Sequence, residues 1–229
     1  MGNNPKTEGE LIEYFKTVDT PTLANAVEVL NIRRRQEGFT PCDIRCIFPE
    51  FGRMCGWAAT AQVETITEAN AHDPTGFQQL FHAVDETRKP TVVVFQELGA
   101  RPEYAVHCGE IVATVLSRLG AVGMITDGGV RDLPEVRAVR FHLFARGAAA
   151  SHARFRIVRV GVPVQILGMT VQPGDFLHGD ENGVLQVPAE HVAKLPAAVD
   201  AVRAAEQPLL EFARGPNFDI DQLVARFLH

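Results

Sequence analysis

The stretch GEIVATVLSRLGAVGMITDGGVRD, which runs from Gly109 to Asp132, decides the fold of this chain. Its apolar residues first recur at helical spacing and then form a short apolar run that ends in an Asp-Gly-Gly turn. The pattern predicts a helix, a buried strand and a tight turn in direct succession. Glu110 opens the helix and the pair Arg131-Asp132 leaves the turn, so these side chains are expected to share one space.

A carboxylate, a guanidinium and a second carboxylate beside a glycine-rich turn can bind a metal ion and an oxyanion at one point. Free backbone N–H groups are expected at the start of the helix, where they would seat a carboxylate or phosphate group. We therefore predict a metal-dependent active site, in which the loop before the helix contacts the substrate through His107, Cys108, Gly109, Glu110 and Ile111.

Each of these residues also has a structural interpretation. Asp132 could cap a short helix, with Glu135 reaching back to complete a capping box. Glu110 could complement the helix dipole, because a carboxylate in the first turn is stabilised there. Arg131 could be a surface arginine paired with Asp127. The residue types alone leave both sets of interpretations open.

Two blocks of the sequence resemble a known family. An acid, a long spacer and then Arg-Asp, with DGGVRD in the turn, is similar to the signature shared by the RraA-like proteins and the 4-hydroxy-4-methyl-2-oxoglutarate / 4-carboxy-4-hydroxy-2-oxoadipate aldolases. The block PVQILGMTVQPGDFLHGDENGVLQVP at residues 163–188 resembles the family's Pro-Gly-Asp, Asp-x-x-Gly-Val and Val-Pro run. The resemblance implies an α/β fold of the phosphohistidine-swivelling β/β/α type, with added terminal helices, assembled as homotrimers or homohexamers.

The resemblance also implies a reaction and its residues. It implies a metal-dependent aldolase that cleaves a 4-hydroxy-2-oxo acid to pyruvate, with oxaloacetate decarboxylase activity through the same enolate. Mg²⁺ or Mn²⁺ would sit on Asp132, and Arg131 would donate to the enolate oxygen. Waters would be held by Glu110 and by Glu206 of a neighbouring subunit, although Glu206 could equally be a solvated carboxylate near Arg203.

The lysines favour a metal over a Schiff base. A pyruvate enolate needs stabilisation by a lysine-derived iminium or by a cation. Lys6, Lys16, Lys89 and Lys194 all stand in polar, terminal or loop-like contexts. We therefore expect a divalent cation to carry this role.

The substrate and the class of activity stay open in the sequence. The loop before Gly109 departs from that of the characterised aldolases, and Glu110 stands where an aspartate is often found, so the part of the substrate beyond the pyruvyl unit is not specified. The alternative is a non-catalytic RraA-like regulator of ribonuclease E. A long C-terminal helix favours the enzyme, since the short regulators lack it. Methyl transfer is disfavoured, because no glycine-rich nucleotide loop follows an early strand.

Composition bounds the other expectations. The chain has 229 residues, 46% of them hydrophobic and 22% charged, which suits one domain over 1–229 with an N-terminal helical region (1–50), an α/β core (51–188) and C-terminal helices (189–229). A net charge of -6 makes nucleic acid an unexpected partner. No leader or long apolar run is found, so we expect a cytoplasmic protein without membrane insertion.

Local patterns predict most of the remaining elements. Thr20 is expected to cap the second of two early helices, and the C-terminal helix is expected to be interrupted near Pro196 and Pro208. His178 is expected to lie in a polar turn or to support residues that contact the ligand, with a satisfied structural histidine as the alternative, and the Asp-rich turns around it are expected to form Asx-type bonds. Helices are expected at 8–18, 21–30, 76–86 and from 189 onward, and strands at 57–66, 91–95, 143–145, 155–160, 164–167 and 184–187.

Overall fold

The principal sheet of the computed structural model, which describes residues 7–66 and 74–227, is mixed and has eight strands within that part of the chain. The strand order is β1-β7-β5-β3-β2-β11-β12, and β8 pairs with the distal half of β2. The strands are β1 (Arg45–Cys46), β2 (Met54–Ile66), β3 (Thr91–Glu97), β5 (Ala121–Thr126), β7 (His142–Ala145), β8 (Arg154–Val160), β11 (Phe176–Asp180) and β12 (Gly183–Val187).

The centre of the sheet is parallel. Pairs β2–β3, β3–β5 and β5–β7 run in the same direction, whereas β11 and β12 are antiparallel additions beside β2. The apolar run of β3, TVVVF, is fully buried, as expected for a parallel strand covered on both faces. Two small sheets pair β9 (Val164–Ile166) with β10 (Met169–Val171), and β4 (Val106–Cys108) with β6 (Gly129–Val130).

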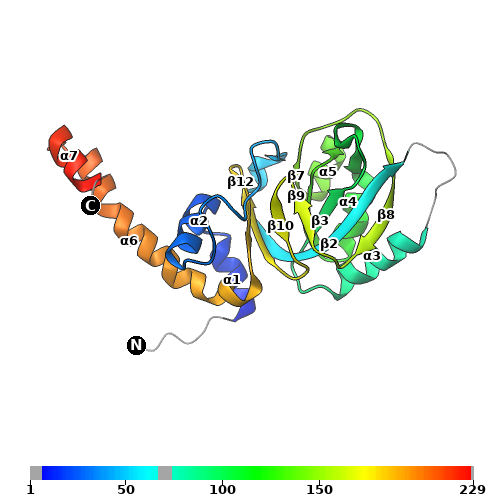
Figure 1. Cartoon of the computed structure of the whole chain (residues 1–229), viewed down its shortest axis with the longest axis horizontal. Helices are drawn as coiled ribbons and strands as arrows, with labels where there is room; N and C mark the ends of the chain where they lie inside the picture. The colour runs from blue at the N-terminus through cyan, green and yellow to red at the C-terminus, as the bar shows by residue number, and fades with distance from the viewer. Residues whose placement is uncertain (1–6, 67–73, 228–229) are drawn as a thin grey trace.

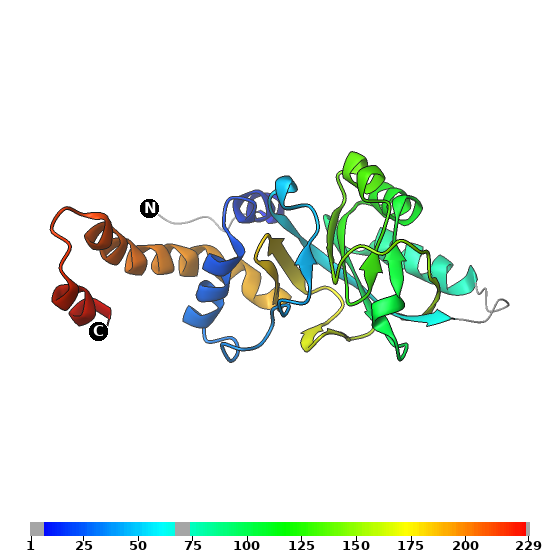
Figure 2. The same ribbon diagram turned by 90° about the horizontal axis from the view of Figure 1, so that it is seen from above.

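The helices form two groups at opposite ends of the sheet (Figure 1). The first group lies beside β3, β5 and β8, and the second packs on β11 and β12 (Figures 1 and 2). The first group is α3 (Pro74–Glu86), α4 (Glu110–Arg118) and α5 (Leu133–Val139), and the second is α1 (Glu8–Phe15), α2 (Thr20–Val29) and α6 (Leu195–Arg214), which leads to α7 (Ile220–Phe227). The molecule therefore has one end with α3, α4 and α5 beside the sheet, and a second, mostly helical end that extends away from it.

Buried polar groups tie the helical end to the sheet. His178 is fully buried; its Nε2 lies 3.0 Å from the carbonyl oxygen of Phe15 and its Nδ1 lies 2.9 Å from Thr20 Oγ1. Asp180 accepts hydrogen bonds from the backbone N–H groups of Thr20 and Asn182. His178 therefore lies in strand β11 and not in a turn, and the alternative of a structural histidine is confirmed together with the Asx-type bond of Asp180.

The expected α/β architecture is confirmed, and four local expectations are wrong. Asp19, not Thr20, caps α2, because its carboxylate accepts the N–H of Thr22 at 2.9 Å. Helix α6 continues through Pro208 without a break. The strands β10 and β11 lie in the second signature block, where the sequence predicted turns. Strands β4 and β6 replace parts of the expected loop and turn. Within the described residues, no helix has the length and apolarity needed to span a membrane.

Candidate active site

Strands β4 and β6 bring the two halves of the first signature together. They pair in parallel, and the backbone N–H of Arg131 donates to the carbonyl oxygen of Cys108 at 2.8 Å. Helix α4 starts at Glu110 directly after β4, with Gly109 as its N-cap. In the sequence, β4 follows β3 and β6 follows β5. Both therefore lie beyond the carboxyl ends of two adjacent parallel strands, the edge at which parallel sheets commonly place ligand sites. The structure therefore brings Glu110, Arg131 and Asp132 to one place.

Asp132 points at the start of α4 rather than capping its own helix. Its backbone is left-handed, with φ 52° and ψ 45°, and its side chain makes no capping hydrogen bond to α5. Instead its Oδ2 accepts the backbone N–H of Glu110 at 3.1 Å. The capping-box interpretation with Glu135 is therefore wrong. A non-glycine residue in this region of φ/ψ space costs on the order of 1–3 kcal/mol, which the surrounding contacts must offset.

Arg131 lies against the same carboxylate. Its Nε is 3.4 Å from Asp132 Oδ2, and the two side chains are 36% and 33% exposed, so both can reach a ligand from solvent. Asp127 is not its partner: Asp127 is buried, and its Oδ1 accepts the backbone N–H of Glu97 at 2.7 Å. The interpretation of Arg131 as a surface arginine paired with Asp127 is wrong.

Gly109 is required by this close approach. A Cβ at position 109 would lie 2.4 Å from Asp132 Oδ2 and 3.1 Å from both Cγ and Nε of Arg131. Atoms do not approach a Cβ at 2.4 Å, so any side chain here would displace the carboxylate. The glycine allows the helix start and the Arg-Asp pair to touch.

The loop expected to bind an anion is shorter in the structure than the sequence predicts. His107 and Cys108 belong to strand β4 and are buried, so they do not line a loop. The first intrahelical bond of α4 runs from the N–H of Ala113 to the carbonyl of Gly109, at 3.0 Å. The N–H groups of Ile111 and Val112 therefore have no partner within the helix and can face an anion. Burial raises the pKa of the Cys108 thiol to about 12, which keeps it protonated.

A buried polar chain beneath the turn was not predicted from the sequence. Glu97, His107 and Thr126 are all buried; His107 Nε2 lies 2.7 Å from Glu97 Oε2, and its Nδ1 lies 2.6 Å from Thr126 Oγ1. Burial opposes ionisation of Glu97, but hydrogen bonds from His107, Thr65 and Gly99 outweigh it and lower the Glu97 pKa. These residues stand far apart in the sequence, so no local spacing could have revealed them.

Glu206 lies at the other end of the chain. It is on α6, and its Oε1 accepts a hydrogen bond from Asn25 Nδ2 at 3.1 Å. Helix α6 leads away from the end that carries α4 and α5 in both ribbon views (Figures 1 and 2). The structure of one chain therefore does not bring Glu206 to the other three residues.

The donor set suits a hard cation held by one carboxylate. Among the described residues, Asp132 Oδ1 has no hydrogen-bond partner, and no cluster of three or more His, Cys, Asp or Glu side chains is found. Mg²⁺ retains most of its waters and accepts a site with few protein ligands. The lysines lie elsewhere: Lys89 Nζ donates to the carbonyl oxygen of Val84, and Lys16 pairs with Glu13.

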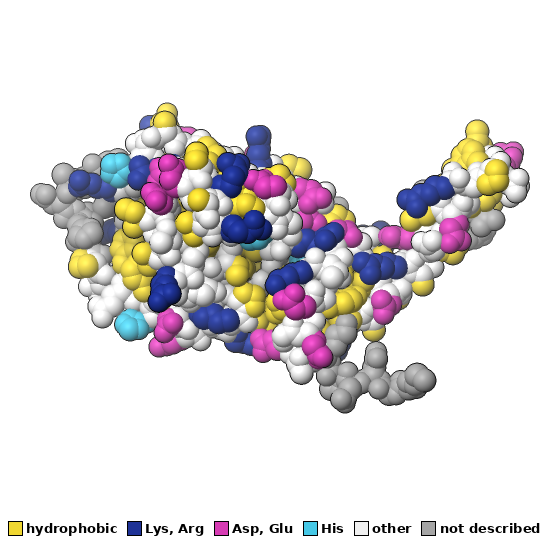
Figure 3. All heavy atoms as spheres, turned by 180° about the vertical axis from the view of Figure 1, so that it is seen from behind, with side chains coloured by type: hydrophobic (Ala, Val, Ile, Leu, Met, Phe, Trp, Pro, Cys, Tyr) yellow, Lys and Arg dark blue, Asp and Glu magenta, His cyan; other side chains and the backbone are white. Residues whose placement is uncertain are grey.

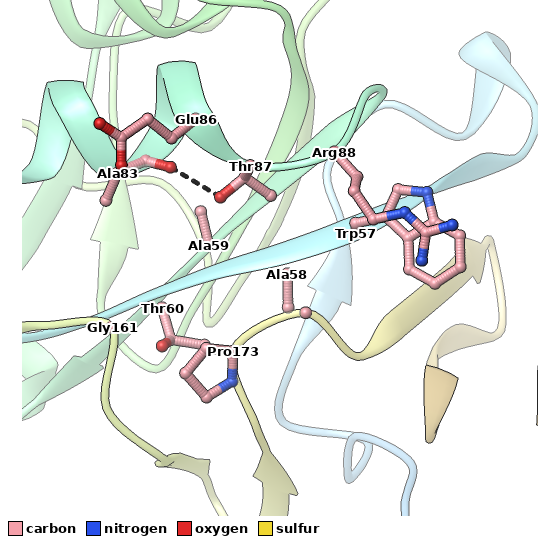
Figure 4. Close-up of a pocket in the computed structure, with 11 residues that line it drawn as sticks. Trp57, Ala58, Ala59, Thr60, Ala83, Glu86, Thr87, Arg88, Gly161 and Pro173 are labelled. Carbon is pink, nitrogen blue, oxygen red and sulfur yellow. Dashed lines mark hydrogen bonds between the residues drawn. The ribbon is translucent and has the colours of Figure 1, made fainter. Parts of the chain in front are cut away.

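A separate pocket of about 260 Å³ opens between β2 and the end of α3 (Figure 4). It lies where β2 changes its partner from β11 to β8. Its lining is mostly small and apolar, and the guanidinium of Arg88 lies over the ring of Trp57 at 3.9 Å. The pocket shares no lining residue with the Arg131-Asp132 site.

Comparisons with known proteins find a family and individual relatives that this chain resembles. The family described as RraA-like: Aldolase/RraA matches residues 20–186, which span both signature blocks. A protein of Thermus thermophilus named putative 4-hydroxy-4-methyl-2-oxoglutarate aldolase is 31% identical over 143 residues, covering 62% of this chain and 82% of that protein. Protein DlpA of Legionella pneumophila is 25% identical over 138 residues; the match covers 58% of this chain but only 22% of DlpA.

A solved structure extends the likeness over the C-terminal helices. Streptomyces coelicolor RraAS2, described as an unusual member of the RNase ES inhibitor RraA protein family, matches with a TM-score of 0.67 at 24% identity. The match covers 93% of this chain and 99% of that one.

Proposed function

The chain belongs to the RraA-like family, and on this premise we propose that it is a divalent-metal-dependent (class II) pyruvate aldolase. The proposed substrate is a 4-hydroxy-2-oxo acid such as 4-hydroxy-4-methyl-2-oxoglutarate, the compound named for the relative from Thermus thermophilus. Decarboxylation of oxaloacetate is proposed as a second activity, because both reactions pass through a pyruvate enolate.

The convergence of Asp132, Arg131 and the first turn of α4 carries this proposal. Asp132 Oδ2 is 3.1 Å from the N–H of Glu110 and 3.4 Å from Arg131 Nε. A fold that needed only a helix cap or a surface ion pair would require neither the left-handed backbone at Asp132 nor the contact that excludes a side chain at Gly109. These features are accounted for if the three groups must meet at a ligand.

The residues have distinct roles in the proposed reaction. The N–H groups of Ile111 and Val112, which have no partner within the helix, would hold the substrate carboxylate at the positive end of the helix dipole. Arg131 would donate to the C2 oxygen as negative charge develops on it, a contact that strengthens toward the transition state. Asp132 would hold Mg²⁺ or Mn²⁺ through Oδ1. The bound cation would supply positive charge that stabilises the enolate.

Glu110 and Glu206 are proposed to hold water at the site from two different chains. Glu110 is exposed at the first position of α4, next to Asp132. Glu206 is remote from it within one chain, so we propose that Glu206 completes the site of a neighbouring subunit in a homotrimer or homohexamer.

A pyruvate-release assay tests the metal requirement. Oxaloacetate and several 4-hydroxy-2-oxo acids would be offered with Mg²⁺, with Mn²⁺ and with excess chelator. Because a single carboxylate binds a cation weakly and reversibly, chelation should abolish release and added metal should restore it. Full activity in excess chelator would contradict the mechanism.

Substitution of Arg131 tests the stabilisation of the enolate. Arg131→Ala should lower kcat by roughly a hundredfold or more, the range seen when one oxyanion donor is lost. Arg131→Lys should recover little of this loss, because a point charge replaces a planar fork of donors. An effect on KM alone would make Arg131 a ground-state binder and remove its proposed role.

The likeness to RraAS2 supports a second candidate function, which is non-catalytic binding to ribonuclease E. The two proposals make opposite predictions for the purified protein. The regulator would slow cleavage of RNA by ribonuclease E and release no pyruvate from any of the substrates with Mg²⁺. The enzyme would release pyruvate, and Asp132→Ala would abolish the release.

A further inference from the structure

The buried chain of hydrogen bonds beneath the turn connects the sheet to the candidate site. Glu97 at the end of β3 accepts four hydrogen bonds: from the N–H and hydroxyl of Thr65, from the N–H of Gly99 and from His107. On the other side of the imidazole, Thr126 Oγ1 accepts the N–H of Gly128 at 3.0 Å. This series of hydrogen bonds therefore runs from a buried carboxylate, through a histidine, to the backbone of the turn.

A neutral imidazole satisfies every partner in this chain. With the proton on Nε2, His107 donates to Glu97 and accepts the hydroxyl proton of Thr126 at Nδ1. The Thr126 oxygen remains free to accept the N–H of Gly128. Glu97 thus accepts a hydrogen bond from a neutral ring, and each polar atom of this series has a partner.

The imidazole also packs directly against the turn. A Cβ at Gly128 would lie 2.7 Å from His107 Cε1 and 2.8 Å from Nδ1, so the turn backbone rests on the ring. Arg131, three residues after Gly128, donates its N–H to the carbonyl of Cys108, the neighbour of His107 in β4. The position of the His107 ring therefore affects the turn, which packs on the ring, and strand β4, which leads directly into α4.

We propose that His107 is a positioning residue for the site, and that Glu97, His107 and Thr126 act as one relay that sets the approach of Asp132 to Glu110. The inference rests on the proposed function in one respect only, which is that this approach matters for turnover. The relay would control the 3.1 Å contact between Asp132 Oδ2 and the Glu110 N–H, and with it the direction of Arg131.

Stability alone gives a poor account of the relay. A buried ionised carboxylate must recover its desolvation cost through hydrogen bonds, and apolar side chains of similar volume stabilise a core as well or better. Phe95 and Phe155 already pack against the His107 ring, so the surroundings suit an apolar residue. The polar groups are explained if the turn must be held in one position by directional hydrogen bonds, which apolar packing beneath it would not provide.

A matched pair of variants tests the proposal. Thr126→Val and Thr65→Val each remove one hydroxyl bonded to the relay, at 2.6 Å from His107 and at 2.8 Å from Glu97. Only the Thr126 hydroxyl reaches the turn. Thr126→Val should lower kcat by roughly tenfold to a hundredfold, because small displacements of reacting groups cost this much. Thr65→Val should keep kcat within about twofold of the wild-type value at a similar Tm. Thr126→Ser keeps the hydroxyl, so its kcat should be close to that of the wild type.

Hydrogen–deuterium exchange gives a readout that does not depend on activity. Thr126→Val should speed exchange in peptides that cover 127–132 and 109–112, and Thr65→Val should not. If the wild-type protein releases no pyruvate, the proposed function fails and the exchange result still decides the relay. Equal exchange in the two valine variants, or equal kcat in an active enzyme, would overturn the proposal. If Thr126→Val does not fold, His107→Asn and His107→Gln replace the pair.

Those two variants separate the arms of the relay. Asn can place an amide near Nδ1 and keep the contact to Thr126, whereas Gln can place one near Nε2 and keep the contact to Glu97. If the relay positions the turn, His107→Asn should show the slower exchange over 127–132 and the higher kcat. The reverse order would overturn the proposal.

Discussion

The site-bearing end of the molecule and its C-terminal arm, residues 195–227, carry proposed site residues in opposite surroundings. At the site end, β4 and β6 are held by backbone bonds, by the relay and by a glycine that leaves no room for a side chain. In the arm, one face of the first half of α6 is buried, but Leu210, Phe218, Ile220 and Val224 are exposed. Figure 3 shows apolar side chains at the tip of the arm.

The difference indicates which parts of the candidate site a single chain can complete by itself. The contacts among Gly109, Arg131 and Asp132 are made within the chain and leave no room for a Cβ at position 109. The arm has uncovered apolar side chains of the kind that mark interaction sites. We therefore expect substitutions at the site end to act within a subunit, and those in the arm to act between subunits or hardly at all.

Among substitutions that leave every proposed site group in place, the largest effect is expected from Gly109→Ala. The new methyl group would lie 2.4 Å from Asp132 Oδ2, so the carboxylate and Arg131 must move apart from the helix start. We expect kcat for pyruvate release to fall by roughly a hundredfold or more, since displacements of about 1 Å have this effect. Steady-state kinetics and thermal unfolding would be measured together.

Gly9→Ala is the matched control in α1, where a Cβ would meet no atom within 4 Å. It should leave kcat unchanged and stabilise the protein by about 0.5–1 kcal/mol at most, as alanine is favoured over glycine in helices. Similar kinetics for the two variants would mean that the close approach at Gly109 has no part in the reaction.

The second prediction concerns the arm and the sharing of sites. Glu206→Ala and Asp132→Ala should each be inactive, because each removes one proposed site group. Co-expressed and verified as mixed oligomers, they should recover pyruvate release above either single variant, since some sites then contain both intact residues. Absence of recovery would place Glu206 outside the shared site. A monomer in sedimentation would remove the proposal of sharing altogether.

The third prediction is a pH dependence confined to the site end. Burial raises the pKa of Asp127 from 3.8 to about 6. Because the folded pKa is the higher one, this group's stabilising contribution is full below the unfolded pKa and is lost as the pH rises through about 6. Asp127→Asn imitates the protonated form and can still accept the N–H of Glu97.

The gain in unfolding free energy of Asp127→Asn over wild type should therefore grow between about pH 4 and pH 7, to on the order of 1–3 kcal/mol. Urea unfolding at several pH values would measure it. Asp221→Asn, an exposed position in α7, should leave the unfolding free energy unchanged at each pH. A constant difference for Asp127→Asn would contradict the assigned effect of burial.

The smallest effect is expected from Pro208→Ala. Proline inside a helix removes one backbone hydrogen bond and costs about 3 kcal/mol locally. The second half of α6 has little packing on the core, so the gain should appear as slower amide exchange over 204–212. The Tm of the core should stay within about 1 °C, as expected when the stabilised segment unfolds separately. A clear rise in Tm would show that the arm and the core unfold together.

The local elements were largely predictable from the sequence, with informative exceptions. Helical spacing located α4, and the apolar run of β5 indicated a buried strand. Strand β11 was missed because Leu-His-Gly-Asp reads as a turn, yet its polar side chains are buried and bonded to Thr20 and Phe15. Pro208 predicted a break that the helix does not have. In both cases longer-range contacts or neighbouring turns override a local preference.

The sequence by itself determined the order of helix, strand and turn between Gly109 and Asp132, and with it the family. Spacing along the chain carries this information, because each element follows from its own residues. Only the tertiary structure decided that Asp132 bonds to Glu110 rather than capping α5, that His107 is buried in a relay with Glu97 and Thr126, and that Glu206 is remote from them. These contacts join residues from separate strands and helices, and their geometry is set by how the parallel strands align and by the space a glycine leaves.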